Sequence, residues 1–321
     1  MNPPPSSPWL SAISSSERPV HGTVTQTQAG ATAAGRTPPP APPREPGIAP
    51  RAAMHARAAV STARSGPPEG GPTGRTRLVR MRSQAPLVLR PTVLVRDEPG
   101  AIAGPQPARV SVAAGAAGPI GGDHLSLDID VGPGSTLVLG EISARLLLPG
   151  PHAEQSRSTT TVRVDRGGTL IWLPQPMIAA TGCRHLNDVH VELAEGARLL
   201  LREEVVLGRH EEVPGTLAQH VRVRRAGRPL YDQRLDFGPE AIGWDSPAVA
   251  GSSRALGSVL VVDPSWADAT PPAQPLGEDA AVLPLSGPAV LISATSPDSL
   301  TLRRALTTGL RSLGHPWAPS V

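Results

Sequence analysis

Side chains that could bind a metal ion gather in one part of the sequence, between Cys183 and Glu212. Cys183 and His185 are two positions apart, so both would lie on one face of a strand. Imidazole and carboxylate groups suit nickel and zinc, whereas a lone thiol favours softer ions. Residues without a regular ligand spacing more often form a solvated surface than a metal-binding site. We therefore expect no closed structural metal centre. The other members of the set are Glu203, Glu204, His210, Glu211 and Glu212.

The motifs of the common enzyme classes are missing from the sequence. A phosphate-binding loop needs a lysine, and the chain has none. His-Glu-x-x-His, Cys-x-x-Cys and Gly-x-Ser-x-Gly are also missing. The sequence therefore predicts a protein that is not an enzyme. The alternative is a β-sheet carbohydrate-binding protein or hydrolase that uses an acidic strand face at Asp128 and Asp130, but few aromatic side chains are available to stack on sugars.

A strand with turns on both sides would position the first of these acidic residues. Apolar and polar residues alternate strictly from Leu125 to Val131, which predicts a half-buried strand with Asp128 and Asp130 on its polar face. Glycine and proline on both sides predict turns. Asp123 lies at the mouth of this strand, where its simplest role is that of an Asx-turn or strand-start residue.

The pattern of a strand, a glycine turn and a second strand recurs at intervals of roughly 30 residues, which indicates stacked structural units. Single hairpins are marginally stable, so several must share a core. We therefore predict a mainly β fold of stacked or superhelical antiparallel sheets, built from repeated hairpins. A C-terminal helix should follow Pro297, with Asp298 or Ser299 as its N-cap. The four copies turn at Gly132, at Gly167-Gly168, at Gly196 and, more faintly, at Gly227.

Composition divides the chain near Gly74. The 39 prolines and 33 glycines are far above ordinary usage, and proline is concentrated in the first 75 residues. Such a segment buries too little apolar surface to offset its ordering entropy, so residues 1–74 are predicted to be a disordered tail and residues 75–321 a single β-rich domain. No secretory or membrane-spanning segment is found. The single cysteine fits a reducing compartment, and we expect a cytoplasmic protein.

The net charge of +3 and the sequence pI of about 10.2 invite a nucleic-acid interpretation. Only seven aromatic residues are present, five Trp, one Tyr and one Phe, which is too few for a base-stacking platform. We expect neither nucleic acid nor a membrane as a partner. The densest basic cluster is better explained as a solvated strand face or a protein-docking patch, and it consists of Arg222, Arg224, Arg225 and Arg228.

Several ordered blocks of the sequence resemble the urease accessory protein D family, also called UreD or UreH, in its actinobacterial form. The resemblance covers about Arg75 to Leu313. Gly140 to Leu146 departs from it, because many relatives have a polar segment and a basic, aromatic strand there. The matching blocks are Met81 to Thr92, Gly118 to Asp123 with its strand and Gly132-Pro133-Gly134, Trp172 to Pro176, Glu203 to Arg209, and Pro229-Leu230-Tyr231.

The resemblance implies a non-enzymatic scaffold that binds accessory protein F directly and the GTPase accessory protein G through it. Together they deliver nickel to the urease apoprotein, so nickel would be in transit and no cofactor tightly bound. Asp123 matches the aspartate of the family's Gly-Gly-Asp motif. Glu203 matches an acidic position that precedes the family's Leu-Gly-Arg motif by a few residues. Glu204 falls at a position where relatives usually have an apolar residue. Asp123 and Glu203 are thus the candidates for a nickel relay. Alternatively, Asp123 caps a turn and Glu203 is a surface acid or the ion-pair partner of an arginine.

Overall fold

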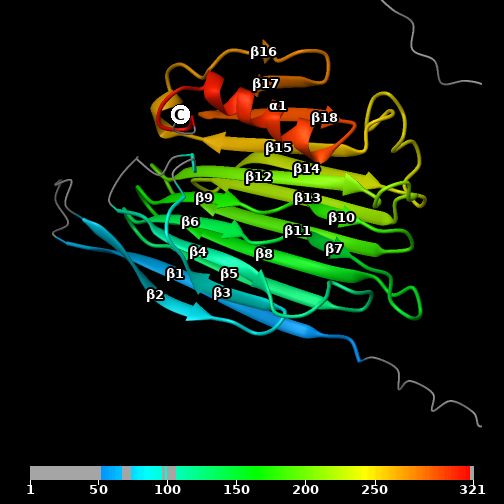
Figure 1. Cartoon of the computed structure of the whole chain (residues 1–321). Coiled ribbons are helices and arrows are strands. Elements are labelled where there is room, and N and C mark those ends of the chain that lie inside the picture. Colours follow the sequence, from blue (N-terminus) through cyan, green and yellow to red (C-terminus); the bar gives the residue numbers. More distant parts are fainter. Residues whose placement is uncertain (1–51, 67–73, 96–97, 100–105, 319–321) are drawn as a thin grey trace, which may run out of the picture. The chain divides into compact units, whose positions relative to one another are not determined.

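The computed structural model describes residues 52–66, 74–95, 98–99 and 106–318, all within one compact unit of residues 50–321. Most of the predicted tail, residues 1–51, lies outside the described residues. Two β-sheets dominate this unit (Figure 1). The seven-stranded sheet, here sheet A, has the order β14-β13-β11-β8-β5-β1-β2. Its strands are β1 (His55–Ser65), β2 (Arg75–Arg82), β5 (His124–Val131), β8 (Ser156–Val164), β11 (Arg184–Leu193), β13 (Thr216–Arg225) and β14 (Arg228–Phe237).

The eleven-stranded sheet, here sheet B, has the order β16-β17-β18-β15-β12-β9-β6-β4-β3, and β10 joins β12 to β7. A short 3-10 helix, η1 (Pro264–Trp266), follows β15, and α1 (Ser299–Ser312) follows β18. The strands of sheet B are β3 (Leu87–Pro91), β4 (Ala108–Ala114), β6 (Thr136–Glu141), β7 (Arg145–Leu147), β9 (Thr169–Leu173), β10 (Met177–Ala179), β12 (Arg198–Leu207), β15 (Ala255–Val262), β16 (Gln274–Pro275), β17 (Ala280–Pro284) and β18 (Ala289–Ser296).

The mainly β architecture of stacked sheets is confirmed, but the predicted hairpins and antiparallel pairing are wrong for three of the four repeats. β5, β8 and β11 are parallel neighbours in sheet A, and each continues through its glycine turn into sheet B, where β6, β9 and β12 are again parallel. Only the fourth repeat, β13 to β14, is an antiparallel hairpin. The chain therefore coils from sheet to sheet.

Backbone bonds between successive turns explain why these three repeats coil. The amide of Gly134 donates to Arg166 O at 3.0 Å, and that of Arg198 donates to Gly168 O at 2.9 Å. Gly134, Gly167 and Gly196 have φ of +60°, +64° and +74°, a conformation that glycine adopts without strain. A strand-turn-strand pattern is the same in both arrangements, so the sequence alone could not separate a coil from a hairpin.

The predicted boundary of the tail at Gly74 is also wrong, because β1 lies inside sheet A. It pairs in parallel with β5 and antiparallel with β2. Ala58 and Val60 are only 0% and 1% exposed. The alternation of β1 uses mostly alanine, serine and threonine, and the composition of the Pro-rich segment before it concealed this pattern.

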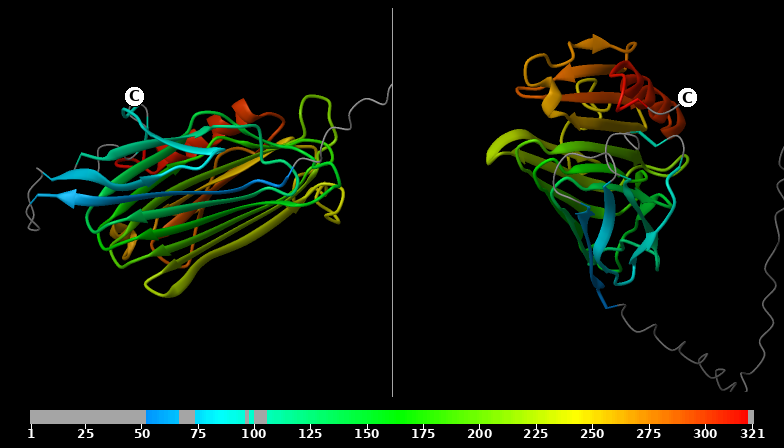
Figure 2. Two further views of the ribbon diagram at one scale, coloured as in Figure 1. Left: turned by 90° about the horizontal axis from the view of Figure 1, so that it is seen from below. Right: turned by 90° about the vertical axis from the view of Figure 1, so that its left-hand side faces the viewer.

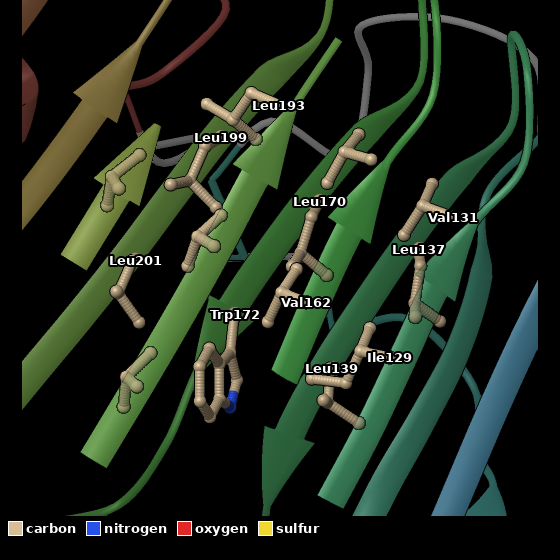
Figure 3. Packing of buried hydrophobic residues seen from close by; sticks show 14 of the residues in the cluster. Ile129, Val131, Leu137, Leu139, Val162, Leu170, Trp172, Leu193, Leu199 and Leu201 are labelled. Atoms are coloured by element: carbon tan, nitrogen blue, oxygen red, sulfur yellow. The ribbon is translucent and has the colours of Figure 1, made fainter. Parts of the chain in front are cut away.

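Apolar side chains from both sheets interlock between them (Figure 3). This main cluster includes Ile129 and Val162 from sheet A, and Leu139, Trp172 and Leu201 from sheet B. All five are at most 3% exposed. The interior of the two-sheet core is therefore the place where polar groups would require an explanation.

The predicted C-terminal helix is confirmed as α1. The side chain of Asp298 caps it by accepting from Leu300 N and Thr301 N, both at 2.9 Å. Leu302, Leu306 and Leu310 face a second apolar cluster on sheet B. Figures 1 and 2 show α1 and the β1–β2 ladder at opposite margins of the unit.

Candidate functional site

A layer of polar side chains crosses the space between the two sheets. Sheet A supplies Ser158, Asn187 and Gln219, which are neighbours in the strand register and are 5%, 3% and 7% exposed. Sheet B supplies a matching row, in which Glu203 pairs with Ser258 and Ser258 with Ser293. The two rows face one another, because Gln219, Glu203, Ser258 and Ser293 line a common cavity.

This polar layer separates two apolar clusters. On β12, Leu201 belongs to the main cluster, and Val205 belongs to a third cluster with Met177 and Phe237. Glu203 lies between Leu201 and Val205 on the same face of the strand. A buried polar group without a partner costs about 1–3 kcal/mol. Packing alone would favour apolar side chains at these positions, so the layer indicates a function.

Three cavities follow one another along the layer. The first, of about 70 Å³, includes Glu141 and Ser158 in its lining, and the second, of about 10 Å³, includes Asn187. The third, of about 220 Å³, includes Gln219. Arg145 and Trp172 line both the first and the second cavity, and Glu203 lines both the second and the third. We call this row the inter-sheet passage; its middle cavity has room for roughly one water molecule.

Glu203 lies at this constriction. Burial raises the pKa of its carboxyl to about 7, although a hydrogen bond from Gln219 and the charge of Arg145 act in the opposite direction. A carboxyl with this pKa exchanges its proton near neutral pH. It could therefore hold a cation briefly by releasing a proton, with amide and hydroxyl oxygens of the layer as further oxygen ligands.

A resident cation, the guanidinium of Arg145, lies beside the constriction. Its Nε is 3.4 Å from Glu141 Oε1, and burial raises the pKa of Glu141 against this attraction. Two buried donors of the passage, Trp172 Nε1 and Ser158 Oγ, have no hydrogen-bond partner among the described residues. Buried polar atoms of this kind normally bond to water. The passage is therefore suited to hydrated cargo.

The structure places Asp123 away from Glu203. Asp123 is fully buried, and its Oδ1 accepts from Met54 N while its Oδ2 accepts from Ile120 N, both at 2.9 Å. The carboxylate therefore ties the segment before β1 to the turn before β5. Gly118 and Pro119 of the same turn line the first cavity, so Asp123 supports the wall of the passage.

Cys183, directly before β11, and His185 on β11 are both buried. Burial raises the pKa of the Cys183 thiol to about 12, and burial with the charge of Arg145 lowers the pKa of His185 to about 3. His185 is therefore neutral, and its Nδ1 is 2.8 Å from Ser156 Oγ. A protonated thiol is a poor metal ligand at neutral pH.

The remaining candidates between Cys183 and Glu212 are dispersed. Glu204 is buried on the opposite face of β12 from Glu203, where it accepts from Arg303 Nη2 at 2.7 Å. Glu212 pairs with Arg209 at 2.8 Å. His210 and Glu211 are exposed. In the part of the chain that the structure describes, no three His, Cys, Asp or Glu side chains are placed to hold a metal ion together.

The acidic strand face at Asp128 and Asp130 lies on the outer face of sheet A. Asp128 pairs with Arg57 at 2.7 Å, and Asp130 pairs with Arg163 at 3.8 Å. Each carboxylate thus has a guanidinium partner on an exposed sheet surface. Neither contributes to the lining of the inter-sheet passage.

Sequence reasoning missed Arg145, Asn187 and Gln219. A usable signal existed, because Asn187 and Gln219 stand at positions that the strand alternation reserves for apolar residues. Glu203 interrupts the same phase in β12, between Leu201 and Val205. Polar residues in the apolar phase of adjacent strands point to a polar layer once the strand order is known.

Fold and site together define a class: a coiled two-sheet β protein with a polar passage through its core. Residues 54–316 match the UreD urease accessory protein family, and the chain belongs to this family. The match includes β1, so the family segment begins before Arg75, where the sequence resemblance was placed. In the described residues, no helix is long and apolar enough to cross a membrane.

Individual relatives agree with this assignment. The urease accessory protein UreD of Streptomyces avermitilis is 40% identical over 262 residues, covering 81% of this chain and 100% of the relative. The protein of the same name from Frankia alni is 42% identical over 282 residues, covering 80% of this chain and 92% of the relative. Urease accessory protein UreD 2 of Saccharopolyspora erythraea is 43% identical over 209 residues, covering 64% of this chain and 74% of the relative.

Proposed function

We propose that this protein is a urease maturation factor that guides nickel to the urease apoprotein through the inter-sheet passage. Family membership supports the maturation role. The observation that carries the nickel step is the polar layer, with Glu203 at its narrowest point. The protein acts as a scaffold and metallochaperone, and it catalyses no covalent step.

A relay of this kind must bind its cargo weakly. Each 1.4 kcal/mol of extra affinity slows release about tenfold at a fixed association rate. One carboxylate with the neutral oxygens of Asn187, Gln219 and Ser258 provides a weaker site than a cage of imidazole and thiolate would. Nickel therefore passes along the layer by exchanging most of its water ligands for these oxygens, and at the constriction it exchanges with the proton of Glu203.

The partners in this proposal follow from the resemblance in the sequence. Accessory protein F binds directly, the GTPase accessory protein G binds through F, and the assembly acts on the urease apoprotein. The absence of a lysine-containing phosphate loop supports this division of labour, because a separate protein must then bind the nucleotide. We place the function in the cytoplasm, a reducing compartment that the lone cysteine favours.

The test compares Glu203→Gln with the matched variant Glu192→Gln. Glu192 lies on the outer face of sheet A, paired with Arg224, so the control removes the same charge outside the passage. Urease is purified from cells that carry each variant, after assembly with accessory protein F has been verified. We expect nickel per urease active site to fall severalfold for Glu203→Gln only. Normal nickel content in both variants would overturn the proposed role of the passage.

A further inference from the structure

Strand β2 carries a row of arginines on one face, although their spacing in the sequence does not predict it. Arg75 and Arg77 occupy odd positions, and Arg80 and Arg82 occupy even ones. Regular alternation would put the two pairs on opposite faces. In the structure, the register between β1 and β2 shifts between Ser61 and Thr62, so that Val79 is an extra residue.

The bulge at Val79 brings all four guanidiniums to the outer face of sheet A. Arg77 pairs with Ala63 and Arg80 with Ser61, which are two residues apart on β1. Both β1 residues belong to the strand face that points away from the core, because Val60 and Thr62 supply the buried face. Arg82 and Arg75 continue the row opposite Ala59 and Ser65.

The arginines of the row have no acidic partner among the residues that the structure describes, unlike several other arginines of this surface. All four β2 arginines are exposed, and none forms an ion pair among the described residues. Elsewhere on the outer face of sheet A, Arg57, Arg163 and Arg222 pair with Asp128, Asp130 and Asp188. Charges and bulges protect an edge strand from unwanted pairing. Protection of the edge strand would not require all four arginines to lie on one face of the sheet, nor to lack acidic partners among the described residues.

We propose that this arginine row binds an extended acidic segment of a partner protein. Alternate side chains of a strand repeat every 6.6–6.8 Å or so, and an extended peptide with acids at alternate positions has the same period. Guanidinium groups bind carboxylates in a bidentate geometry. The small, partly exposed side chains of Ser61 and Ala63 leave space beside the row. The row spans about 20 Å, the length of about seven extended residues.

The composition of the two strands favours a peptide over a nucleic acid. Neither β1 nor β2 contains Phe, Tyr or Trp, so no aromatic platform is present for bases to stack on. The row lies at the margin of the unit opposite α1 (Figures 1 and 2), and its use is independent of the inter-sheet passage.

The experiment measures binding of three labelled probes to the full chain by fluorescence anisotropy. One peptide alternates four glutamates with four threonines, a second has the same composition with its glutamates contiguous, and the third probe is an eight-nucleotide oligothymidylate. We expect the alternating peptide to bind at least threefold more tightly than the other two. Equal affinity for the two peptides would overturn the inference, and so would tighter binding of the oligonucleotide.

Matched double variants locate the site. Arg77→Gln with Arg80→Gln should weaken binding of the alternating peptide about tenfold, from two exposed charge pairs worth about two- to fivefold each. Arg163→Gln with Arg224→Gln removes equal charge elsewhere on the same face and should change binding less than twofold. Equal weakening by both would overturn the inference. If a variant fails to fold, the comparison of the three probes on the unaltered chain still tests whether the row prefers an alternating acidic peptide.

An exchange variant tests the shared face. Arg80→Met combined with Met81→Arg keeps charge and composition but moves one guanidinium off the row. We expect it to weaken binding by the same factor as Arg80→Gln alone. Unchanged binding in the exchange variant would show that net charge alone attracts the peptide, which would overturn the proposed alignment.

Discussion

Glu203 of β12 and Gln219 of β13 face one another across the space between the two sheets. The two residues belong to different sheets and line the same cavity. The Gln219 amide lowers the pKa of the Glu203 carboxyl, whereas burial, the larger effect, raises it. A side chain that must ionise inside a protein core usually costs stability, and function often explains why it is present.

Glu203→Gln should therefore stabilise the protein in a pH-dependent way. In the folded chain the pKa of Glu203 is raised to about 7, above its ordinary value of 4.5. Well below pH 4.5 Glu203 is protonated in both the folded and the unfolded chain, so its carboxyl group does not lower the free energy of unfolding. As the pH rises towards 7 the unfolded chain ionises first, so the free energy of unfolding falls. At pH 8 we expect the variant to be more stable by about 3 kcal/mol, because a pKa difference of about 2.5 units is worth about 3.4 kcal/mol.

Urea unfolding of both proteins at pH 5 and pH 8 tests this expectation, with Glu192→Gln as the control. The stability difference between Glu203→Gln and the unaltered chain should be about a quarter as large at pH 5 as at pH 8, because most of the interval between the two pKa values lies above pH 5. A difference of equal size at both pH values would show that the Glu203 carboxyl does not titrate in the folded interior.

Asp123→Ala should destabilise the fold by about 2–3 kcal/mol, because the amides of Met54 and Ile120 both lose their acceptor. Asp123→Asn keeps one carbonyl oxygen and should cost about half as much. Denaturant unfolding measures both, and nickel per urease active site is measured in parallel. A stable Asp123→Ala protein that assembles normally but fails to load nickel would instead support a relay role for this residue.

A chain that starts at residue 75 should be insoluble or unfolded. It lacks β1, so β5 and β2 lose their common neighbour, and the buried Ala58 and Val60 are removed. A chain that starts at residue 52 retains β1 together with Met54, which Asp123 binds. Soluble yield and thermal unfolding of the two truncated proteins test the role of β1. Equal stability would show that β1 is dispensable.

Glu204→Gln should cost about 3–5 kcal/mol, because it breaks buried ion pairs and leaves the Arg202 and Arg303 guanidiniums without their shared acid. Glu212→Gln breaks the surface pair with Arg209 and should cost less than about 1 kcal/mol. Replacing Glu204, Arg202 and Arg303 together with leucine should recover much of the loss. Chemical denaturation measures all three. Equal losses for Glu204→Gln and Glu212→Gln would argue against a role for Glu204 in docking α1.

Local patterns in the sequence predicted the individual elements well. Strict alternation from Leu125 to Val131 predicted β5, and the cap at Asp298 predicted the start of α1. These features depend on contacts within a few residues, so their signal is present in the order of the residues. The family could be recognised for a related reason, because its ordered blocks are linear motifs.

The tertiary structure decided which strands are neighbours and what each polar side chain does. Glu203 and Glu204 are adjacent in sequence, yet one faces the passage and the other an ion pair under α1, because neighbouring side chains of a strand point to opposite faces. The sequence also left Asp123 with two roles, and its bond to the amide of Met54, 69 residues away, ties it to the fold. Pairing between distant segments is set by the competition of many strands for partners, and no local pattern records its outcome.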